Sequence, residues 1–172
     1  SEGPPSESKS RLVVFDYGGG TLDIAVCEIT WKDHHPEITV LSCDGVTDAG
    51  DVLDNALVEH MRLRLGMEPH ELEEGISLAA IQLAVRRAKE DLSFVEHAVV
   101  ELEPYGLPNV GLSRQELENQ FRPQLERALE FVTYCLRGAK LRESGHLSPA
   151  TLRQLDFREL AKDVDQVVLA GG

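Results

Sequence analysis

Apolar and polar residues alternate along three stretches near the N-terminus, and this pattern predicts three β-strands. The strands are expected over 12–15, 22–29 and 37–43, because side chains two residues apart lie on one face of a strand. Residues 33–36, which contain two histidines and a proline, are expected to form a loop between the second and third strands. The chain is therefore expected to begin with three sequential strands.

Two further stretches repeat apolar residues every three or four positions, which predicts helices with one buried face. The first helix is expected to begin at an N-cap, Asp51, and to end at Gly66. The acidic stretch 68–75 is expected to be a connection, and the second helix should cover 77–92. The buried face of this second helix is expected to carry Leu78, Ile81, Val85, Ala88 and Leu92.

A small hairpin and a capped helix are predicted next. Residues 97–103 alternate as a strand does, and the turn residues at 105–108 lead into a short return strand. Ser113 and Glu116 have the spacing of a capping box, which begins a third helix. Pro123 is expected to break or kink that helix, because proline lacks an amide donor and its ring clashes with the preceding turn.

The C-terminal part is expected to return to the sheet. A fourth helical segment is predicted over 124–136, with a loop at 142–145 and a short helix beginning at Ser148 and Pro149. The apolar run 164–170 predicts a buried strand. The apolar residues expected on the buried face of the fourth segment are Leu125, Leu129, Val132 and Leu136.

This order of elements predicts an α/β fold. A mixed sheet flanked by helices, with a smaller α+β subdomain inserted into it, accounts for three strands, two helices, a hairpin, two helices and a strand. Residues 11–48 and 121–172 are expected to form the sheet subdomain, and 49–120 the inserted one. Residues 1–10 are rich in Ser, Pro, Gly and Glu and are expected to be a linker or disordered end.

Length and charge narrow the classes of function. A chain of 172 residues fits one domain or two small subdomains. Its net charge of −13 argues against binding to nucleic acid or to an anionic membrane surface. No stretch approaches the roughly 20 apolar residues of a membrane span, and the N-terminus lacks a signal-peptide core. A cytoplasmic protein is expected, with neither nucleic acid nor membrane as a partner.

Cysteine and histidine give no strong sign of a metal site. Cys27, Cys43 and Cys135 are odd in number and widely spaced, without a CxxC pair, so buried and reduced thiols are expected. His34 and His35 are adjacent near a loop, where successive side chains of an extended backbone point in different directions. A solvated turn is the simpler interpretation of these histidines.

The strongest candidate site is the stretch Asp-Tyr-Gly-Gly-Gly-Thr-Leu-Asp at 16–23. Three consecutive glycines weaken a strand, so a purely structural role would be costly. They permit positive φ angles, and they let a ligand approach backbone N–H groups that can converge on an anion. Asp16 and Asp23 flank the turn, and carboxylates suit a cation bound beside a phosphate. The pattern therefore predicts a hairpin that binds a phosphate and a metal ion.

Five segments in the same order resemble the heat-shock 70 kDa protein family, in the second lobe of its actin-like, ribonuclease H-like ATPase domain. The hairpin resembles the family's second phosphate motif, and Val-Val-Leu-Ala-Gly-Gly at the C-terminus resembles its adenosine motif. Arg-Arg-Ala-Lys-Glu-Asp-Leu-Ser resembles its adenosine-contacting helix. The resemblance covers nearly the whole chain, and its segments are 14–24, 48–55, 86–93, 112–117 and 167–172.

The resemblance implies a set of ligand contacts. ATP or ADP with Mg²⁺ is the expected ligand, with Asp16 orienting the water shell of the magnesium ion and Asp23 near a monovalent or divalent cation. Gly50 would approach the ribose, while Lys89 and Ser93 would approach the adenosine. The β- and γ-phosphates would be held by Gly18, Gly19, Gly20 and Thr21. The residues that would pass under the nucleotide are Gly171 and Gly172.

Some residues depart from the family's pattern. Arg86 stands where the family usually has Glu, and Glu90 stands where it commonly has a residue that packs on the adenine. The two positions either exchange charge while keeping an ion pair or weaken the contact with the base. The hairpin at 105–109 is shorter than the family's and the connection 141–165 is longer, which indicates a divergent member.

The first phosphate motif, its catalytic lysine and a whole first lobe have no counterpart in these residues. The chain is therefore expected to be a fragment that does not hydrolyse ATP alone, from a parent that couples hydrolysis to chaperone action under stress. Unfolded polypeptides or co-chaperones would bind through other parts of that parent.

The same residues bear on four other interpretations. A scaffold or regulatory protein of the same fold with a degenerate site is one alternative, and a sugar or acid kinase of the actin-like superfamily is another. A P-loop NTPase is excluded because the sequence has no GxxxxGK[ST]. A Ser/His/Asp hydrolase is disfavoured because neither Ser113 nor Ser148 lies in a GxSxG elbow.

Overall fold

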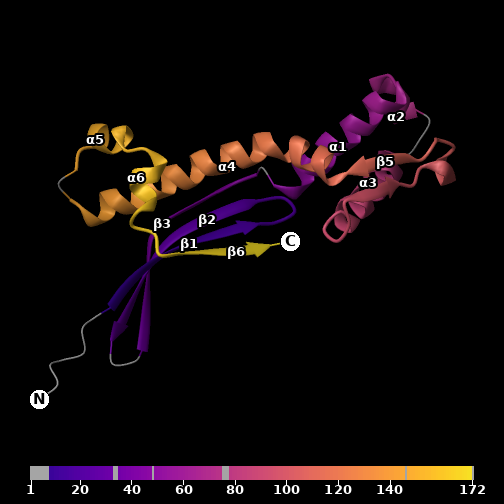
Figure 1. Ribbon diagram of the computed structural model, residues 1–172. Helices are drawn as coiled ribbons and strands as arrows, with labels where there is room; N and C mark the ends of the chain where they lie inside the picture. Colours follow the sequence, from indigo (N-terminus) through magenta and orange to yellow (C-terminus); the bar gives the residue numbers. More distant parts are fainter. Residues whose placement is uncertain (1–7, 33–34, 48, 75–77, 146, 172) are drawn as a thin grey trace, which may run out of the picture. The chain divides into compact units, whose positions relative to one another are not determined.

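Figure 1 shows the computed structural model of the protein. Two compact units make up the chain, each with its own hydrophobic core. The first combines Ser1–Ala49 with Glu126–Gly172, and the second is Gly50–Leu125. The residues that the structure describes are 8–32, 35–47, 49–74, 78–145 and 147–171.

The first unit is built on a four-stranded mixed sheet, which confirms the predicted fold class (Figure 1). The strand order is β3-β2-β1-β6, in which β1 pairs with β2 and β2 with β3 in antiparallel fashion, whereas β6 runs parallel to β1. The four strands are β1 (Ser8–Tyr17), β2 (Leu22–Lys32), β3 (His35–Val46) and β6 (Gln166–Gly171). Consequently, the C-terminal ends of β1 and β6 lie side by side next to the β1–β2 turn.

Strand β1 begins earlier than the sequence predicts. Ser8 pairs with Trp31 of β2, so residues 8–10 belong to the sheet and the expected linker over 1–10 is wrong for them. Pairing with a long neighbouring strand satisfies the backbone donors and acceptors of this polar segment, which its composition alone does not indicate. Residues 1–7 lie outside the described part of the chain.

The connection between β2 and β3 is shorter than the predicted loop at 33–36. His35 already pairs with Lys32 in the antiparallel ladder, and its side chain is exposed. His34 lies outside the described residues.

One face of the sheet packs against the C-terminal part of α4 (Arg114–Glu143). The strand register places Val13 opposite Val26 and Phe15 opposite Ile24, and these residues contribute to that core. Side chains alternate along a strand, so Asp16 faces the opposite side of the sheet. The α4 residues buried in this core are Ala128, Val132, Cys135, Leu136 and Ala139.

Helix α4 differs from the prediction in two respects, its continuity through Pro123 and the set of side chains that it buries. It continues through Pro123 to Glu143, so the expected break and the expected loop start at 142 are wrong. Side chains on both sides of the proline are anchored in hydrophobic cores, which offsets the roughly 3 kcal/mol that a helix-interior proline costs. Leu125 and Leu129 are exposed, because the helix buries its small Ala residues instead.

Strand β6 is exposed along its whole length, so the buried strand expected at 164–170 is wrong in its burial. It is an edge strand, and in the described chain only β1 pairs with it. Two short helices precede it, α5 (Pro149–Gln154) and α6 (Phe157–Ala161). The predicted start of α5 is confirmed, since the Ser148 hydroxyl caps it by accepting from the Thr151 amide at 3.1 Å.

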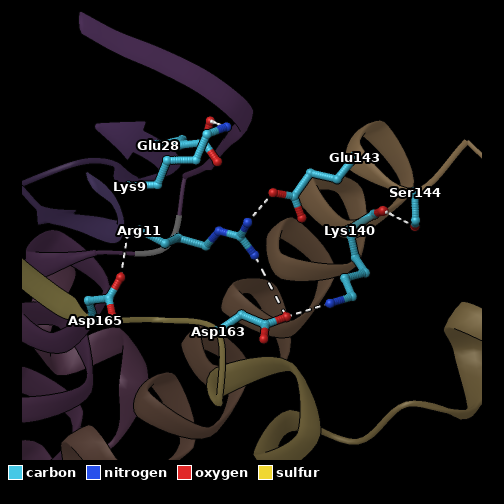
Figure 2. A network of polar contacts seen from close by, with 8 residues as sticks. All are labelled: Lys9, Arg11, Glu28, Lys140, Glu143, Ser144, Asp163 and Asp165. Atoms are coloured by element: carbon cyan, nitrogen blue, oxygen red, sulfur yellow. Dashed lines mark hydrogen bonds and ion pairs between the residues drawn. The ribbon is translucent and has the colours of Figure 1, made fainter. Parts of the chain in front are cut away.

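A network of charged side chains fastens the start of β1 to the C-terminal end of α4 (Figure 2). The Arg11 guanidinium contacts Glu143 and lies 3.8 Å from Asp163, which also accepts a hydrogen bond from Lys140. The Arg11 backbone amide donates to the Asp165 carboxylate at 2.7 Å. The Lys140 hydrogen bond holds the pKa of Asp163 below its usual range. These contacts tie α4 and the segment between α6 and β6 to strand β1.

The second unit packs two helices on a two-stranded sheet. The sequence pattern correctly predicts α1 and its end before Gly66, which has a φ of 68°. The expected N-cap is wrong, because the helix already begins at Gly50 and Asp51 lies in its first turn. The pattern misses α2, because the connection expected at 68–75 is partly helical, beginning at a proline suited to a first turn. The elements are α1 (Gly50–Leu65), α2 (Pro69–Glu74), α3 (Leu78–Asp91), β4 (His97–Val100), η1 (Glu103–Tyr105) and β5 (Val110–Ser113).

Most of the predicted buried face of α3 is confirmed. Ile81, Val85, Ala88 and Leu92 are in the core, whereas Leu78 is exposed at the first residue of the helix. Strand β4 ends at Val100, earlier than expected, because the chain then turns into η1.

The predicted capping box begins α4. The Ser113 amide donates to Glu116 Oε2 at 2.8 Å, and the Glu116 amide donates to the Ser113 hydroxyl at 3.2 Å. These hydrogen bonds hold the pKa of Glu116 below its usual value, with the Ser113 hydroxyl as the largest cause.

All three cysteines are free thiols. Cys27 and Cys135 are buried as expected, but Cys43 is exposed on the edge strand β3. Burial raises the pKa of Cys135 to about 11. Among the described helices, none is both long enough and apolar enough to cross a membrane.

Candidate functional site

The turn between β1 and β2 is short and carries almost no side chains. The Gly18 amide donates to the Thr21 carbonyl at 2.9 Å and closes the turn, directly after the last pair of the ladder. Gly19 and Gly20 are exposed, and a Cβ atom built at Gly19 would meet no atom within 4 Å. A ligand could therefore reach the backbone of this turn without steric obstruction.

Gly18, Gly19 and Gly20 do not have the positive φ angles that three consecutive glycines would permit. The described glycines with positive φ are Gly66, Gly106 and Gly171. What the turn gains from Gly18–Gly20 is therefore bare backbone that a ligand can approach closely.

Asp16 and Asp23 lie directly opposite each other in the β1–β2 ladder. Paired residues of antiparallel strands point to the same face, so both carboxylates lie on the face away from α4. Both are exposed, and within the described part of the chain neither has a hydrogen bond or ion pair. Two unpaired carboxylates side by side repel each other, and a cation between them would relieve that repulsion.

Glycines on the two outer strands make room for these carboxylates. Gly45 of β3 pairs with Asp23, and a Cβ atom there would overlap the carboxylate oxygen. Gly171 of β6 pairs with Tyr17, and a Cβ atom there would overlap the Tyr17 carbonyl and lie 2.9 Å from Asp16 Oδ1. Gly171 also has a φ of 92°, which side-chain-bearing residues rarely adopt. Gly171 is therefore required, because it meets backbone, whereas a side chain at Gly45 would only displace the exposed Asp23 carboxylate.

The described residues contain no group of three or more His, Cys, Asp or Glu arranged to hold a metal ion. The acidic pair at Asp16 and Asp23 is therefore a partial ligand set. Magnesium commonly uses one or two protein carboxylates and completes its octahedron with water and phosphate oxygens. The pair fits that kind of site.

The second set of predicted site residues lies in the second unit, on α1 and α3. Gly50 is the first residue of α1, and Lys89 lies in the last turn of α3. Ser93 is exposed, one turn beyond Lys89, where its amide donates to the Glu90 carbonyl at 3.0 Å. Gly172 lies outside the described residues.

A buried carboxylate, Asp54, connects the two helices. It is 4% exposed and lies on the buried side of α1. Its Oδ2 accepts a hydrogen bond from Arg86 Nε at 2.9 Å, and its Oδ1 accepts one from the Lys89 ammonium. Arg86 also reaches Asp51 Oδ1 at 3.3 Å. Lys89, a predicted adenosine contact, is thus held by a carboxylate of the neighbouring helix.

The charge exchange considered for Arg86 and Glu90 is not what the structure shows. Arg86 forms its ion pairs with Asp51 and Asp54 of α1. The Asp54 hydrogen bond is the main cause that raises the pKa of Arg86, and the charge of Glu90 is the weakest contributor.

Sequence analysis missed the role of Asp54. Its position offers a signal, since Asp54 lies three and four residues before the core residues Leu57 and Val58, and seven before Met61. An acid at a position of the apolar stripe is costly unless a cation pairs with it. That spacing predicts a buried ion pair, although not its partner.

Comparisons with known proteins place the chain in a family. A family model described as Hsp70 protein matches residues 4–146, so the chain belongs to the Hsp70 family. The chain is similar to the protein named chaperone protein DnaK from Stenotrophomonas maltophilia (strain R551-3), with 28% identity over 94% of this chain. It is also similar to the chaperone protein DnaK from Thermoplasma volcanium, with 31% identity over 81% of this chain. The chain spans 24% of the length of each of these relatives.

Proposed function

We propose that this chain is the second lobe of the nucleotide-binding domain of a chaperone-like ATPase, and that its β1–β2 hairpin binds the phosphates of ATP or ADP. The observation that carries the proposal is the bare turn at Gly18–Gly20, which lies beside two unpaired carboxylates. A turn with no side chains leaves N–H groups accessible to an anion. Membership in the Hsp70 family supports the same ligand.

Magnesium is the proposed cofactor at this end of the sheet. Asp16 is proposed to orient the water shell of the ion, and Asp23 to lie near a monovalent or divalent cation. When bound, the metal ion supplies positive charge that neutralises the phosphate oxygens. The chain's own contribution is to hold the two carboxylates, which are hard oxygen ligands, next to the turn. Glycine at position 171 leaves space beside the Asp16 carboxylate.

The remaining predicted residues are proposed to bind the nucleoside. Gly50 approaches the ribose, Lys89 and Ser93 approach the adenosine, and Gly171 and Gly172 pass beneath the nucleotide. Asp54 fixes the Lys89 ammonium, so this contact is pre-organised before the ligand arrives.

The lobe by itself is proposed to be catalytically inactive. Phosphoryl transfer depends on groups that position and neutralise the phosphate from both sides. In the longer protein, hydrolysis would change the closure of two lobes and pass that change to a client-binding region. Unfolded polypeptides and co-chaperones are the proposed partners, in the cytoplasm and under stress.

A second candidate function is a regulatory or scaffold protein whose nucleotide site is degenerate. The observation that favours it is the double use of Asp54, because Arg86 and Lys89 share one carboxylate. A lysine bound in this way is less available to a ligand. Nucleotide binding separates the two candidates, since a degenerate site has no measurable affinity for ATP.

The test is calorimetric titration of ATP with Mg²⁺ into the full-length protein and into residues 1–172. We expect clear binding by the full-length protein and weak or undetectable binding by the lobe. The Gly19→Val variant of the full-length protein should lose binding while its far-UV circular dichroism stays unchanged, because a side chain at Gly19 meets nothing. Intact binding by Gly19→Val would show that the glycines serve only the turn.

A further inference from the structure

A cavity of about 150 Å³ lies on the second unit, and none of the residues proposed to bind the nucleotide lines it. Sites for drug-sized ligands measure about 300–1,000 Å³, so this cavity suits a smaller ligand. Helix α3 contributes Ala84, Arg87 and Asp91 to its lining. The remaining lining residues come from β4 and from the segment that follows it.

The segment that leads from β4 into η1 is a preformed wall of the cavity. Glu101 lies between Val100 and Leu102, which are both completely buried in the core of the second unit. The Asn109 side chain accepts hydrogen bonds from the Leu102 amide at 2.7 Å and from the Glu103 amide at 3.0 Å. A ligand therefore meets a backbone that is already held in place, which lowers the entropic cost of binding.

The polar groups around the cavity have no partners within the described chain. Arg87 and Asp91 are four residues apart on α3, a spacing at which side chains can meet, yet they form no ion pair. Glu101 and the Tyr105 hydroxyl likewise have neither a hydrogen bond nor an ion pair to a described residue. By contrast, the charges of the network around Arg11 in the first unit pair with one another. The cavity thus offers one unpaired cation and two unpaired carboxylates to a ligand.

The cavity also has an apolar part. Ala84, Val99 and Pro104 line it, and Tyr105 adds an aromatic ring whose residue is 38% exposed. Aliphatic chains gain free energy when such surfaces are removed from water. A ligand that fits must therefore combine charges of both signs with a short apolar chain.

We propose that this cavity binds a diamino acid such as lysine, which has one carboxylate, two ammonium groups and an aliphatic chain. Arg87 pairs with the carboxylate, because a guanidinium can bind a carboxylate through two parallel hydrogen bonds. Asp91, one helical turn from Arg87, pairs with the α-ammonium group beside that carboxylate. Glu101 pairs with the side-chain ammonium group, and the methylene groups lie on Val99 and Tyr105.

The unpaired arginine distinguishes this ligand from a simple cation. A protein with a net charge of −13 attracts cations of any kind at low salt. Arg87 repels a cation that carries no carboxylate, such as a polyamine, and attracts one that does. The cavity therefore favours an amino acid with surplus positive charge.

The test measures dissociation constants of the full-length protein by ligand-observed NMR, with L-lysine, L-norleucine and Nα-acetyl-L-lysine amide. Norleucine lacks the side-chain ammonium group, and the blocked lysine lacks both charges of the head group. L-lysine should bind about fivefold more tightly than either of them, the factor expected for one exposed ion pair.

Substitutions assign these differences to residues. Glu101→Gln should weaken L-lysine binding about fivefold and leave norleucine binding unchanged, whereas Arg87→Gln should weaken the binding of both. Glu90→Gln is the matched control, since Glu90 is an exposed acid of α3 that does not line the cavity. The far-UV circular dichroism of all three variants should match that of the wild type.

Each of four results would overturn the inference. No binding of L-lysine would show that the cavity is only a solvated hollow. Equal affinity for the blocked lysine would assign the cavity to a lysine side chain of a protein partner. Equal affinity for norleucine would remove the role of Glu101. An equal loss in Glu90→Gln and Glu101→Gln would show a general attraction of cations to an acidic protein.

Discussion

Replacing Asp54 with alanine should destabilise the second unit more than any other single-charge change on α1. Asp54 is 4% exposed and receives hydrogen bonds from both Arg86 and Lys89. Removal of its carboxylate leaves two cations without their shared partner. The two cations are not equally affected, because their exposures differ.

The Arg86 side chain is 52% exposed and keeps Asp51 as a second partner, so water can solvate it after the substitution. The Lys89 side chain is only 24% exposed and has no other ion pair in the described chain. Removing one partner of a fully buried ion pair costs about 3–5 kcal/mol. Since one of the two cations here is half exposed, we expect a smaller loss of about 2–3 kcal/mol, just below that range.

Urea denaturation followed by far-UV circular dichroism measures this loss, because most of the second unit is helical. Asp51→Ala is the matched control: the residue is an acid on the same helix and pairs with the same arginine, but its side chain is 64% exposed. Exposed ion pairs contribute at most about 1 kcal/mol. If Asp54→Ala and Asp51→Ala lose the same free energy of unfolding, the buried ion pair does not stabilise this unit and the reasoning is wrong.

Three other predictions concern the first unit. Gly171→Ala should lower its stability, because the φ of 92° and the overlap with the β1 carbonyl leave no room for a methyl group; the shift of the denaturation midpoint checks this. The folded-state pKa of Asp163 is lowered, so the stability it contributes is fully present above its unfolded pKa of about 3.9 and is lost as pH falls through the lower folded value. Asp163→Asn should therefore reduce the loss of stability below about pH 4, measured by Trp31 fluorescence. At pH 8 a thiol reagent should modify Cys43 quickly and Cys135 slowly, because Cys43 is exposed and burial raises the pKa of Cys135 to about 11; equal rates would contradict this.

Local signals were sufficient to predict the elements near the hairpin and the helix caps. The alternation from Leu22 onward and the capping box at Ser113 and Glu116 depend on residues within a few positions of one another. Gly66 likewise ends α1 through its own backbone conformation. Such features are readable because both partners of each interaction lie in one short segment.

Features that depend on tertiary packing were not predictable. Val132 and Leu136 are buried as predicted, but Leu125 and Leu129 of the same stripe are exposed, and Ala128 and Ala139 are buried because small side chains let the helix approach the sheet. The exposure of β6 depends on which strands pair with it, and the partners of Asp54 lie on another helix. No local pattern specifies these choices.

The two groups of proposed ligand contacts differ in how their charges are compensated, and this decides how each responds to a ligand. Asp54 already has two cations, so the nucleoside contacts on α3 are neutralised by the protein itself. Asp16 and Asp23 have no cation in the described chain and lie side by side in a protein whose net charge is −13. A phosphate group alone would add negative charge beside them, which costs free energy. The proposed phosphate binding at the hairpin would therefore be coupled to a metal ion, whereas the proposed nucleoside contacts on α3 would not.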